Sequence, residues 1–366
     1  MTTGICNPFT PAFGTIPLFM AGRDPLIASM RSAFETGARD PNLSTILIGA
    51  RGTGKTALLS RISDEAKQAG WIVVDVAASK GMLEDIVQRA LESASELIPN
   101  SGRKRLTGIE LAQMIGLQWE TEAPSPANWR TKMNAIFNQL AQTDTGLLIT
   151  VDEVKSTYDE MIRLASTYQL FVRENRKVAL LMAGLPKHVS ALVSNDDVSF
   201  LRRARQHYLG KIRSAEVEIA FEKTVAAGGK SIERAALKEA VAAIDGFPYM
   251  MQLVGYYAWM AGTEADVIDG AHVERGIEFA RSDLEKGVLE ATYRELSAGD
   301  RAFLNAMLSC GGEPHLSDVA KAMGKPNGYA SSYKSRLTGQ GIVEELPGGG
   351  LEVSLPFFRD YLIRQA

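Results

Sequence analysis

One eight-residue segment constrains this chain more than any other. Residues 49–56 read GARGTGKT, which matches the pattern G-x-x-x-x-G-K-[S/T] at every fixed position. Glycines at these places let the backbone curl so that its N–H groups point at phosphate oxygens. An apolar stretch that predicts a strand over residues 45–48 precedes the segment, and an amphipathic helix follows it. The match therefore has the strand–loop–helix context that a phosphate-binding loop requires.

The residues of this loop have separate predicted roles around the phosphates of ATP. The ammonium group of Lys55 would reach the β- and γ-phosphates and assist catalysis, and the hydroxyl of Thr56 would bind Mg²⁺. The helix that starts near Lys55 directs the positive end of its dipole at the same anion. The alternative is a chance glycine-rich turn, which the flanking strand and helix disfavour. The predicted nucleotide contacts are Gly49, Ala50, Arg51, Gly52, Thr53, Gly54, Lys55, Thr56 and Ala57.

Two carboxylates follow an apolar stretch farther along the chain. Residues 147–151 read LLITV and run directly into Asp152 and Glu153. A strand buried in a parallel sheet ends in this way where it reaches the ligand-binding edge of the sheet. We expect Asp152 to hold Mg²⁺ through its water shell and Glu153 to polarise the attacking water as general base. The alternative is an ordinary strand end capped by acids, which the neighbouring phosphate loop disfavours.

Alternation of strands and helices predicts an α/β fold. Apolar strands without polar alternation, separated by helices, indicate a parallel sheet that is covered on both faces. A helix capped by Asp24 precedes the first strand, and another covers residues 82–97. Residues 99–128 lack periodicity, and we interpret them as an insertion. The predicted strands are residues 45–48, 71–76, 147–151 and 178–183.

Composition limits the class of protein further. A chain of 366 residues is too long for one compact core, so two or three domains are expected. The formal net charge of −3 gives no overall attraction to nucleic acid or to an acidic membrane. Cys6 and Cys310 form no metal or redox motif, which fits a reducing compartment. The start of the chain has no secretory pattern, and no stretch reaches the ~20 apolar residues that span a bilayer. These features predict a cytoplasmic protein without a membrane partner.

The phosphate-binding motif at residues 49–56 and the acidic motif at residues 147–153 together resemble those of the AAA+ family. Within that family they resemble the Orc1/Cdc6-like and STAND-like ATPases. The segment Gly22-Arg23-Asp24 is similar to the Gly-Arg-[Glu/Asp] motif of this group. In that group the loop before the first helix closes over the adenine, so the resemblance implies that Gly22 and Arg23 line the nucleotide. Ile16, Pro17 and Phe19 would then pack against the base. The alternative is a capped surface helix.

Further family motifs lie beyond the sheet. Residues 246–248 read Gly-Phe-Pro and resemble the Gly-x-Pro signature of a helical lid, which implies that Pro248 faces the nucleotide. After the fourth strand, the resemblance implies an arginine that senses γ-phosphate, sometimes on a neighbouring subunit of an ATP-dependent oligomer. Arg203 is our choice among Arg202, Arg203 and Arg205, and a solvated basic helix end is the alternative for the other two.

One departure from the family concerns turnover. Many AAA+ proteins end the fourth strand with Asn, Ser or Thr, which holds the lytic water, whereas this strand ends Met182-Ala183-Gly184. Side chains of these three types cannot hold a water molecule. The sequence therefore predicts an ATPase that is slow or stimulated by a partner. STAND-like members share such a strand end, so the resemblance implies a switch more than a motor. A nucleotide-binding protein without useful turnover is a further alternative.

The C-terminal part changes character again. After about residue 212 the strands stop and consecutive helices follow, with Ser214 and Ser231 as expected N-caps. Residues 297–366 read as a helix, a helix–turn–helix and a strand–turn–strand, which resembles a winged helix. The predicted organisation is a P-loop NTPase sheet domain of the AAA+ type over residues 1–212, an α-helical lid over 213–290 and a winged helix over 295–366.

The partner of the winged helix has two candidate classes. Residues on or beside the expected recognition helix could bind duplex DNA. Residues 294–366, however, hold eight basic and eight acidic residues, and Glu344 and Glu345 open the wing. Such a balance lacks the basic excess of phosphate-driven binding, so a protein partner, as in a signalling switch, is the alternative. The candidate DNA contacts are Lys325, Tyr329, Ser331, Ser332, Lys334 and Arg336.

Overall fold

The computed structural model describes residues 6–12, 14–37, 39–96, 126–155 and 159–365. They divide into two compact units. The sheet unit comprises Pro25–Ile48 and Leu58–Tyr208. The lid unit comprises the described residues up to Asp24, the loop segment Gly49–Ala57 and the chain from Leu209 onward. The insertion expected at residues 99–128 lies, apart from its last three residues, outside the described part. The predicted division into three domains stays a prediction.

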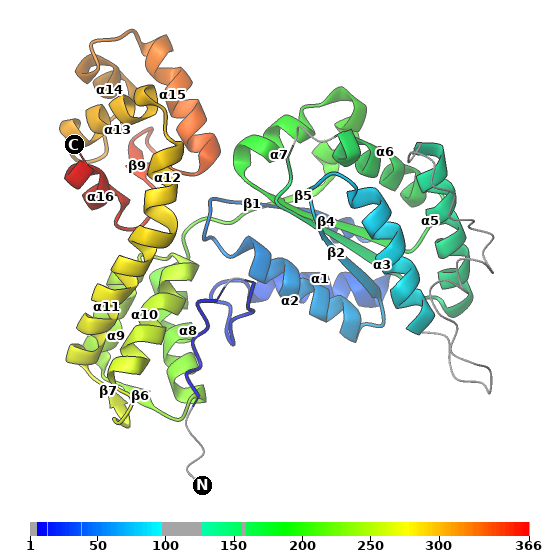
Figure 1. Cartoon of the computed structure of the whole chain (residues 1–366), viewed down its shortest axis with the longest axis horizontal. Coiled ribbons are helices and arrows are strands. Elements are labelled where there is room, and N and C mark those ends of the chain that lie inside the picture. The colour runs from blue at the N-terminus through cyan, green and yellow to red at the C-terminus, as the bar shows by residue number, and fades with distance from the viewer. Residues whose placement is uncertain (1–5, 13, 38, 97–125, 156–158, 366) are drawn as a thin grey trace. The chain divides into compact units, whose positions relative to one another are not determined.

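A five-stranded parallel sheet forms the centre of the sheet unit, which confirms the predicted α/β fold (Figure 1). The strand order is β2-β3-β4-β1-β5. The inner strands are buried almost throughout because helices cover both faces, which explains why their sequences are continuous apolar runs. The strands are β1 (Ser44–Ile48), β2 (Ile72–Ala77), β3 (Leu147–Asp152), β4 (Val178–Gly184) and β5 (Arg205–Tyr208).

Helices flank this sheet on its two faces (Figure 1). The first two helices lie on one face, where Met30 of the first helix meets Thr45 of β1. The remaining helices bury their apolar sides against the other face, together with Ile46, Ile149 and Met182. The helices are α1 (Asp24–Thr36), α2 (Lys55–Gln68), α3 (Met82–Glu96), α5 (Pro126–Leu140), α6 (Asp159–Arg173) and α7 (Pro186–Val193), with short 3-10 turns η1 (Pro41–Leu43), η2 (Ala141–Thr143) and η3 (Asp196–Arg203).

The edge strand β5 was not expected from the sequence. Its residues Arg-Gln-His-Tyr are polar and partly exposed, so they give no apolar run. The strand nevertheless pairs in parallel with β1, where Ile48 lies beside Tyr208. The backbone of β1 supplies this edge with hydrogen-bonding partners that a reading of side chains cannot reveal.

Helices dominate the first part of the lid unit. The expectation that strands stop after residue 212 is wrong, because Ser231 and Ile232 pair in parallel with Val267 and Ile268. Ser231 is therefore a strand residue and not a helix cap. Ser214 is the first residue of its helix, one position after the N-cap. The elements are α8 (Ser214–Ala227), β6 (Ser231–Ile232), α9 (Arg234–Ile244), α10 (Pro248–Ala261), β7 (Val267–Ile268), α11 (Gly270–Leu284), the π-helical turn η4 (Glu285–Leu289) and α12 (Glu290–Glu295).

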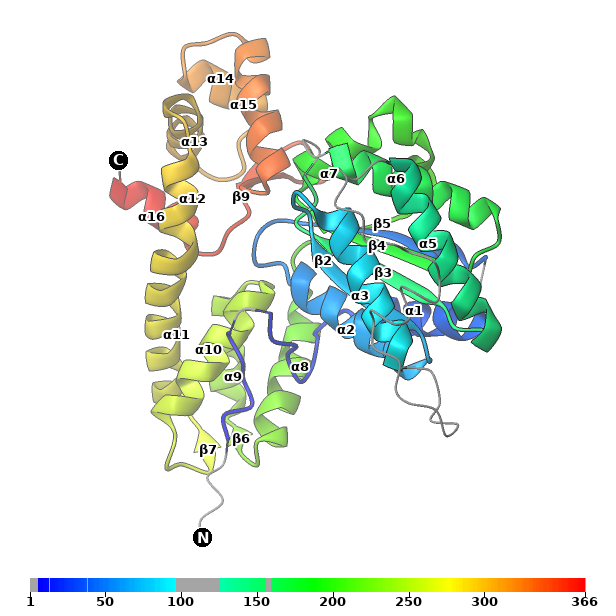
Figure 2. The ribbon, with the colours of Figure 1, turned by 45° about the vertical axis from the view of Figure 1, so that its right-hand side comes forward.

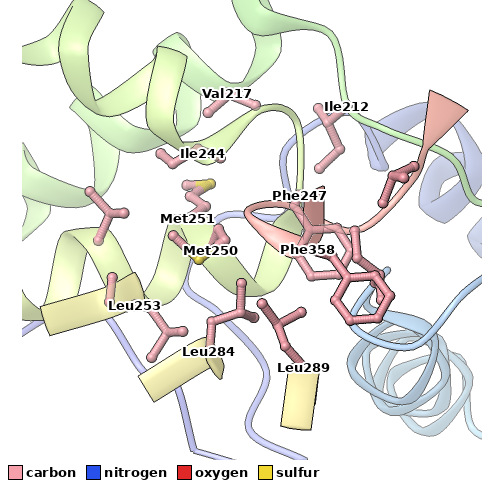
Figure 3. Close-up of a cluster of buried hydrophobic side chains, with 14 of the residues drawn as sticks. Ile212, Val217, Ile244, Phe247, Met250, Met251, Leu253, Leu284, Leu289 and Phe358 are labelled. Carbon is pink, nitrogen blue, oxygen red and sulfur yellow. The ribbon is translucent and has the colours of Figure 1, made fainter. Parts of the chain in front are cut away.

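The C-terminal module, residues 297–365, follows from this helical part without a break in the core. Helix α11 leads through η4 into α12 as a nearly continuous rod (Figure 2). Phe358 of the last helix belongs to the same buried cluster as Phe247, Met250 and Leu289 (Figure 3). The order of elements agrees with the sequence prediction. They are α13 (Ala298–Cys310), α14 (Leu316–Ala322), α15 (Asn327–Gln340), the antiparallel strands β8 (Val343–Glu345) and β9 (Leu351–Val353), and α16 (Phe358–Gln365).

Within the described residues, no helix combines the length and the apolar character that crossing a membrane requires.

A buried carboxylate fastens α1 to α2 in the sheet unit. Glu65 is 1% exposed and pairs with Arg31 and Arg61, each at 2.6 Å. Hydrogen bonding from Arg31 is the main cause that holds the pKa of Glu65 below its usual value. Protonating this carboxyl in the folded protein therefore costs free energy, so its stabilising effect is complete above the unfolded pKa and is lost as the pH falls through the folded pKa.

We expect Glu65→Gln to lower the free energy of unfolding by about 1–3 kcal/mol, because the charge-assisted hydrogen bond from Arg31 is weakened and the ion pair with Arg61 is lost. Urea denaturation between pH 7 and pH 3 measures this. The deficit of the variant should shrink as the pH falls, since the wild-type carboxyl then becomes neutral as well. The control Glu35→Gln changes an exposed residue of α1 and should have little effect. A constant deficit at every pH would contradict the assignment.

Candidate nucleotide-binding site

The backbone of the phosphate loop has the curled conformation that its sequence predicts. Gly52 and Gly54 have φ of 79° and 82°, in the left-handed region that residues with a Cβ rarely adopt. Gly49 is required for a different reason. A Cβ at Gly49 would lie 2.6 Å from the hydroxyl oxygen of Thr53 and 2.9 Å from the carbonyl oxygen of Leu209. Of the two fixed glycines of the motif, Gly54 is therefore required by its backbone conformation and Gly49 by the lack of space for a side chain.

Hydrogen bonds close this loop on itself. The ammonium group of Lys55, the first residue of α2, donates to the carbonyl oxygens of Gly49 at 2.9 Å and Ala50 at 2.7 Å. The Thr53 hydroxyl donates to the same carbonyl of Ala50 at 2.9 Å. The cation thus lies over the concave loop, where a phosphate group would offer it stronger, charged acceptors.

The Gly-Phe-Pro segment lies against the loop within the lid unit. A Cβ on Gly52 would come 2.4 Å from the Phe247 ring, so this ring rests directly on the glycine. Pro248, the first residue of α10, lies 3.7 Å from the equivalent position at Gly54. Gly246 has a φ of 69° and approaches the backbone of Ile212 closely. Pro248 thus lies beside the loop, and that it faces the nucleotide stays a prediction.

Gly22 and Arg23 directly precede α1 and contact Glu216 in the first turn of α8 and Gly210 before it. Gly22 has a φ of 67°, and a Cβ there would meet the Glu216 carboxylate at 2.7 Å. Arg23 donates from Nη2 to the carbonyl oxygen of Gly210 at 3.3 Å. Burial lowers the pKa of Arg23, against the opposing effect of the Glu216 carboxylate. These two residues are therefore held on the lid by their own contacts.

The C-terminal module also contacts the phosphate loop, which the sequence did not indicate. Gly341, the left-handed residue that ends α15, lies so close to Ala50 that an added Cβ would come within 2.5 Å of the alanine Cβ. Just before this module, Glu295 at the end of α12 pairs with Arg51 at 3.2 Å, and both side chains are half exposed. A glycine after a helix signals only a helix end. The sequence therefore does not reveal that Gly341 packs against Ala50.

In the sheet unit, Asp152 and Glu153 end β3 in a strained turn. Glu153 has a φ of 52°, which is uncommon for a residue with a side chain. Its N–H donates to the Asp152 carboxylate at 2.8 Å, and the following Val154 N–H donates to the carbonyl oxygen of Ala183 at 2.9 Å. The turn leaves Glu153 exposed and Asp152 half buried. Strain of this kind concentrates at functional sites.

Strand register places these acids at the edge of the sheet where β1 ends. Val151 lies beside Met182 of β4, and Met182 lies beside Ile46 of β1. The chain then leaves β1 after Ile48 and continues as the phosphate loop. Since the carboxyl ends of parallel strands share one edge, Asp152 ends its strand on the edge where that loop begins.

Each of the two units carries an oxygen donor of the kind that Mg²⁺ prefers. Among the described residues, no group of three or more His, Cys, Asp or Glu side chains is arranged to hold a metal by itself. Magnesium at phosphate sites usually takes one or two protein oxygens, with phosphate and water completing the shell. The Thr56 hydroxyl and the Asp152 carboxylate are hard oxygen donors of this type.

The three arginines after β4 have different surroundings. Arg202 donates to the carbonyl oxygen of Val193 at 3.2 Å and pairs with Asp196 at 3.7 Å. Arg203 ends η3, Arg205 begins β5, and both are exposed. Arg202 is thereby the least available of the three for a phosphate. The role of Arg203 stays a prediction.

Two of the candidate DNA contacts are engaged within the C-terminal module. Lys334 pairs with Glu345 at 2.7 Å. Arg336 donates from Nε at 2.7 Å to Asp300, a carboxylate that is 2% exposed. The aromatic side of α15 remains accessible, with Tyr329 43% exposed. The other four candidates are Lys325, Tyr329, Ser331 and Ser332, all exposed.

Comparison with known proteins supports the assignment of the fold. Residues 20–182 match the family model of an AAA ATPase domain, and residues 286–362 match a domain of unknown function (DUF8462). The search of curated proteins finds no match. A Walker-type ATPase of Pyrococcus abyssi is similar in structure, with a TM-score of 0.63 and 12% identity over 94% of this chain and 96% of that chain.

Two further solved structures have lower TM-scores. The ORC2 protein of Aeropyrum pernix has a TM-score of 0.49 and 16% identity, over 97% of this chain and 95% of that chain. A RuvB protein of Thermotoga maritima has a TM-score of 0.46 and 15% identity, over 97% and 98%. We base the fold on the Pyrococcus protein and on the sheet itself. Residues 20–182 are thus similar in sequence to AAA ATPase domains, and the sheet has the P-loop NTPase fold of the AAA+ type.

Proposed function

We propose that this protein binds Mg-ATP and hydrolyses it slowly, as a nucleotide-dependent switch. The observation that carries this proposal is the shape of the phosphate loop. Gly52 and Gly54 have the left-handed backbone that a phosphate-binding loop uses to direct its N–H groups at an anion, and Lys55 lies within hydrogen-bonding distance of Gly49 and Ala50 of the same loop. A triphosphate chain is the ligand that the N–H groups of such a loop, a helix N-terminus and an ammonium group accommodate together.

Each residue of the site has a distinct part in the proposed reaction. Lys55 exchanges its bonds to Gly49 and Ala50 for β- and γ-phosphate oxygens. Thr56 and Asp152 hold Mg²⁺, which when bound neutralises charge on those oxygens. Glu153 accepts a proton from water as the water oxygen bonds to the γ-phosphorus and the bond to the β-phosphate bridging oxygen breaks. The products are ADP, phosphate and one proton.

The end of β4 supports slow turnover. Met182 and Ala183 are buried and apolar, and they offer no group that could orient the attacking water. A Cβ at Gly184 would lie 3.1 Å from both Val154 and Val189, so even a serine there would require its neighbours to shift. Positioning of the water therefore depends on Glu153 or on a group from a partner, such as an arginine of a second subunit.

The contacts on the phosphate loop support a switch. Phe247 of the lid rests on Gly52, and Gly341 of the C-terminal module rests on Ala50. A nucleotide that reorders the loop would change the free energy of both contacts. Such differential interaction is what allows a ligand to shift the population of two conformations. A nucleotide-dependent change in the position of the C-terminal module would then alter its binding to a partner.

For that partner, duplex DNA held by a winged helix is the first candidate and a protein is the second. The second gains support from the pairing of Lys334 with Glu345 and of Arg336 with Asp300, because paired cations release fewer counterions from DNA. Exposed Tyr329 and the acids of the wing suit a protein surface of mixed charge. The protein would then act as a STAND-like regulatory ATPase.

Two substitutions separate binding from hydrolysis. Lys55→Ala should weaken Mg-ATP binding by at least about tenfold, because the main phosphate cation is lost. Glu153→Gln should retain binding but lower the ATPase rate by about 10²-fold or more, since the general base is removed. Calorimetry and phosphate release measure the two effects, with Lys67→Ala on the exposed part of α2 as control. Unchanged binding in Lys55→Ala would overturn the proposal.

The close contact between the loop and the lid gives a matched pair of glycine variants. Gly52 and Gly70 have φ of 79° and 78°, but only Gly52 faces a ring, since nothing lies within 4 Å of a Cβ at Gly70. Both alanine variants should lose about 1–2 kcal/mol of stability from backbone strain. Only Gly52→Ala should also lose Mg-ATP affinity in calorimetry. Equal affinities for the two variants would show that this packing does not matter for the nucleotide.

The partner class is tested by gel shift with duplex DNA at low salt, with and without ATP. A DNA-binding module should shift the duplex, and Lys325→Ala should weaken binding and reduce its salt dependence by about one counterion. Tyr329→Ala serves as the comparison, because it removes no charge. Absence of a shift at low salt in both nucleotide states would reject DNA and leave the protein partner.

A further inference from the structure

The chain before the first helix is anchored deep in the lid. Phe9 is 2% exposed and its ring centre lies 4.9 Å from that of Phe221 on α8. On α10, Gly255 leaves the space that the ring fills, because a Cβ there would lie 2.2 Å from Phe9. A Cβ at Gly228 would lie 2.4 Å from the Trp259 ring and 2.9 Å from Pro8. The absence of a side chain at Gly255, and in part at Gly228, thus gives this segment its place on the lid.

Polar contacts fix the backbone on either side of the ring. Asn7 donates from Nδ2 to the carbonyl oxygen of Tyr256 at 3.0 Å and accepts from the Phe9 N–H at 3.0 Å. The Thr10 N–H donates to Oε1 of Gln252, also at 3.0 Å. Gln252 is only 8% exposed, so its carbonyl oxygen is satisfied by this segment in a largely buried place. The segment is therefore seated specifically and not only by apolar contact.

A second attachment follows at Gly22 and Arg23, through Glu216 and Gly210. Between the two attachments, Ile16, Pro17 and Phe19 are half buried and Leu18 is 58% exposed. These four side chains are apolar and carry no charge for phosphate. The attachment at Gly210 is next to Leu209, which lies against Gly49 of the phosphate loop, so these side chains can offer a nucleotide at that loop an apolar contact with its base.

We propose that Phe9 is a positioning residue for recognition of the nucleotide base. It does not touch the nucleotide. Its seat between Phe221 and Gly255 holds the segment that carries residues 16–19, so that these side chains are ordered before the base arrives. A loop that is already ordered avoids the entropy cost of ordering on binding, which raises affinity. This inference rests on the proposed function, because it needs a nucleotide at the phosphate loop.

The seat of Phe9 can be disturbed from both sides. Phe9→Ala empties it, and Gly255→Ala displaces the ring by placing a methyl group where the ring lies. Phe9→Leu is the conservative variant that keeps an apolar anchor. Phe303→Leu, in the buried core of α13, is the control for general loss of core packing in the lid unit. Circular dichroism and urea denaturation establish that each variant is folded.

The readout is calorimetric binding of Mg-ATP compared with Mg-tripolyphosphate, which has the phosphates but no base. In Phe9→Ala and Gly255→Ala we expect Mg-ATP to bind about tenfold more weakly, with tripolyphosphate unchanged within about twofold. Phe9→Leu should recover most of the affinity, and Phe303→Leu should alter neither ligand selectively.

Two results would overturn the role of Phe9. One is unchanged binding of Mg-ATP in both anchor variants, and the other is an equal loss for both ligands, which would indicate general loosening of the fold. If the wild-type protein binds neither Mg-ATP nor tripolyphosphate, the proposed function fails and this inference fails with it. Binding of tripolyphosphate with no added affinity for Mg-ATP would reject the base contact alone.

Discussion

The left-handed backbone at Gly52 and Gly54 is the constraint on which the candidate site depends. It turns the loop back on itself, so that Lys55 reaches the carbonyl oxygens of Gly49 and Ala50. It also leaves an outer surface without side chains, on which Phe247 can rest directly. One backbone conformation thus serves both the loop, where phosphate would bind, and the packing of Phe247 on that loop. A side chain at Gly52 would strain the backbone and meet the ring, whereas one at Gly54 would strain the backbone alone.

A different form of strain marks the acidic side of the site. Glu153 adopts a left-handed conformation despite its side chain, and it is held there by its own hydrogen bond to Asp152 and by the bond from Val154 to Ala183. The buried strand β3 supplies the rigid support for this turn. The conformation exposes one carboxylate and leaves the other half buried, which suits their different proposed tasks of accepting a proton and holding a metal.

The sequence predicted the parts of this fold whose residues carry their own signal. The apolar runs of β3 and β4 gave the sheet, and the glycine spacing gave the phosphate loop, because burial and backbone curvature are local demands. Strand β5 was not predicted, because its residues are polar and only their backbone pairing with β1 makes them a strand. The contact of Gly341 with Ala50 and the seat of Phe9 against Gly255 escaped for a related reason. Each contact joins residues that are distant in sequence through steric fit. In the sequence, these positions show only a single glycine or phenylalanine, which does not indicate its partner.

The division of the chain into two units groups the residues of the candidate site according to their proposed roles. The phosphate loop, the lid residue Phe247 and the segment anchored by Phe9 all belong to the lid unit, whereas Asp152 and Glu153 belong to the sheet unit. Residues proposed to hold the base and the phosphates are therefore connected by packing to one another. Asp152, proposed to hold the metal together with Thr56, and Glu153, proposed to activate the water, are supported by the sheet. Under the proposed function, affinity would then depend mainly on the lid unit, and turnover would depend also on the acids of the sheet unit. A switch needs such a division, because the nucleotide can then be held while hydrolysis awaits a further signal.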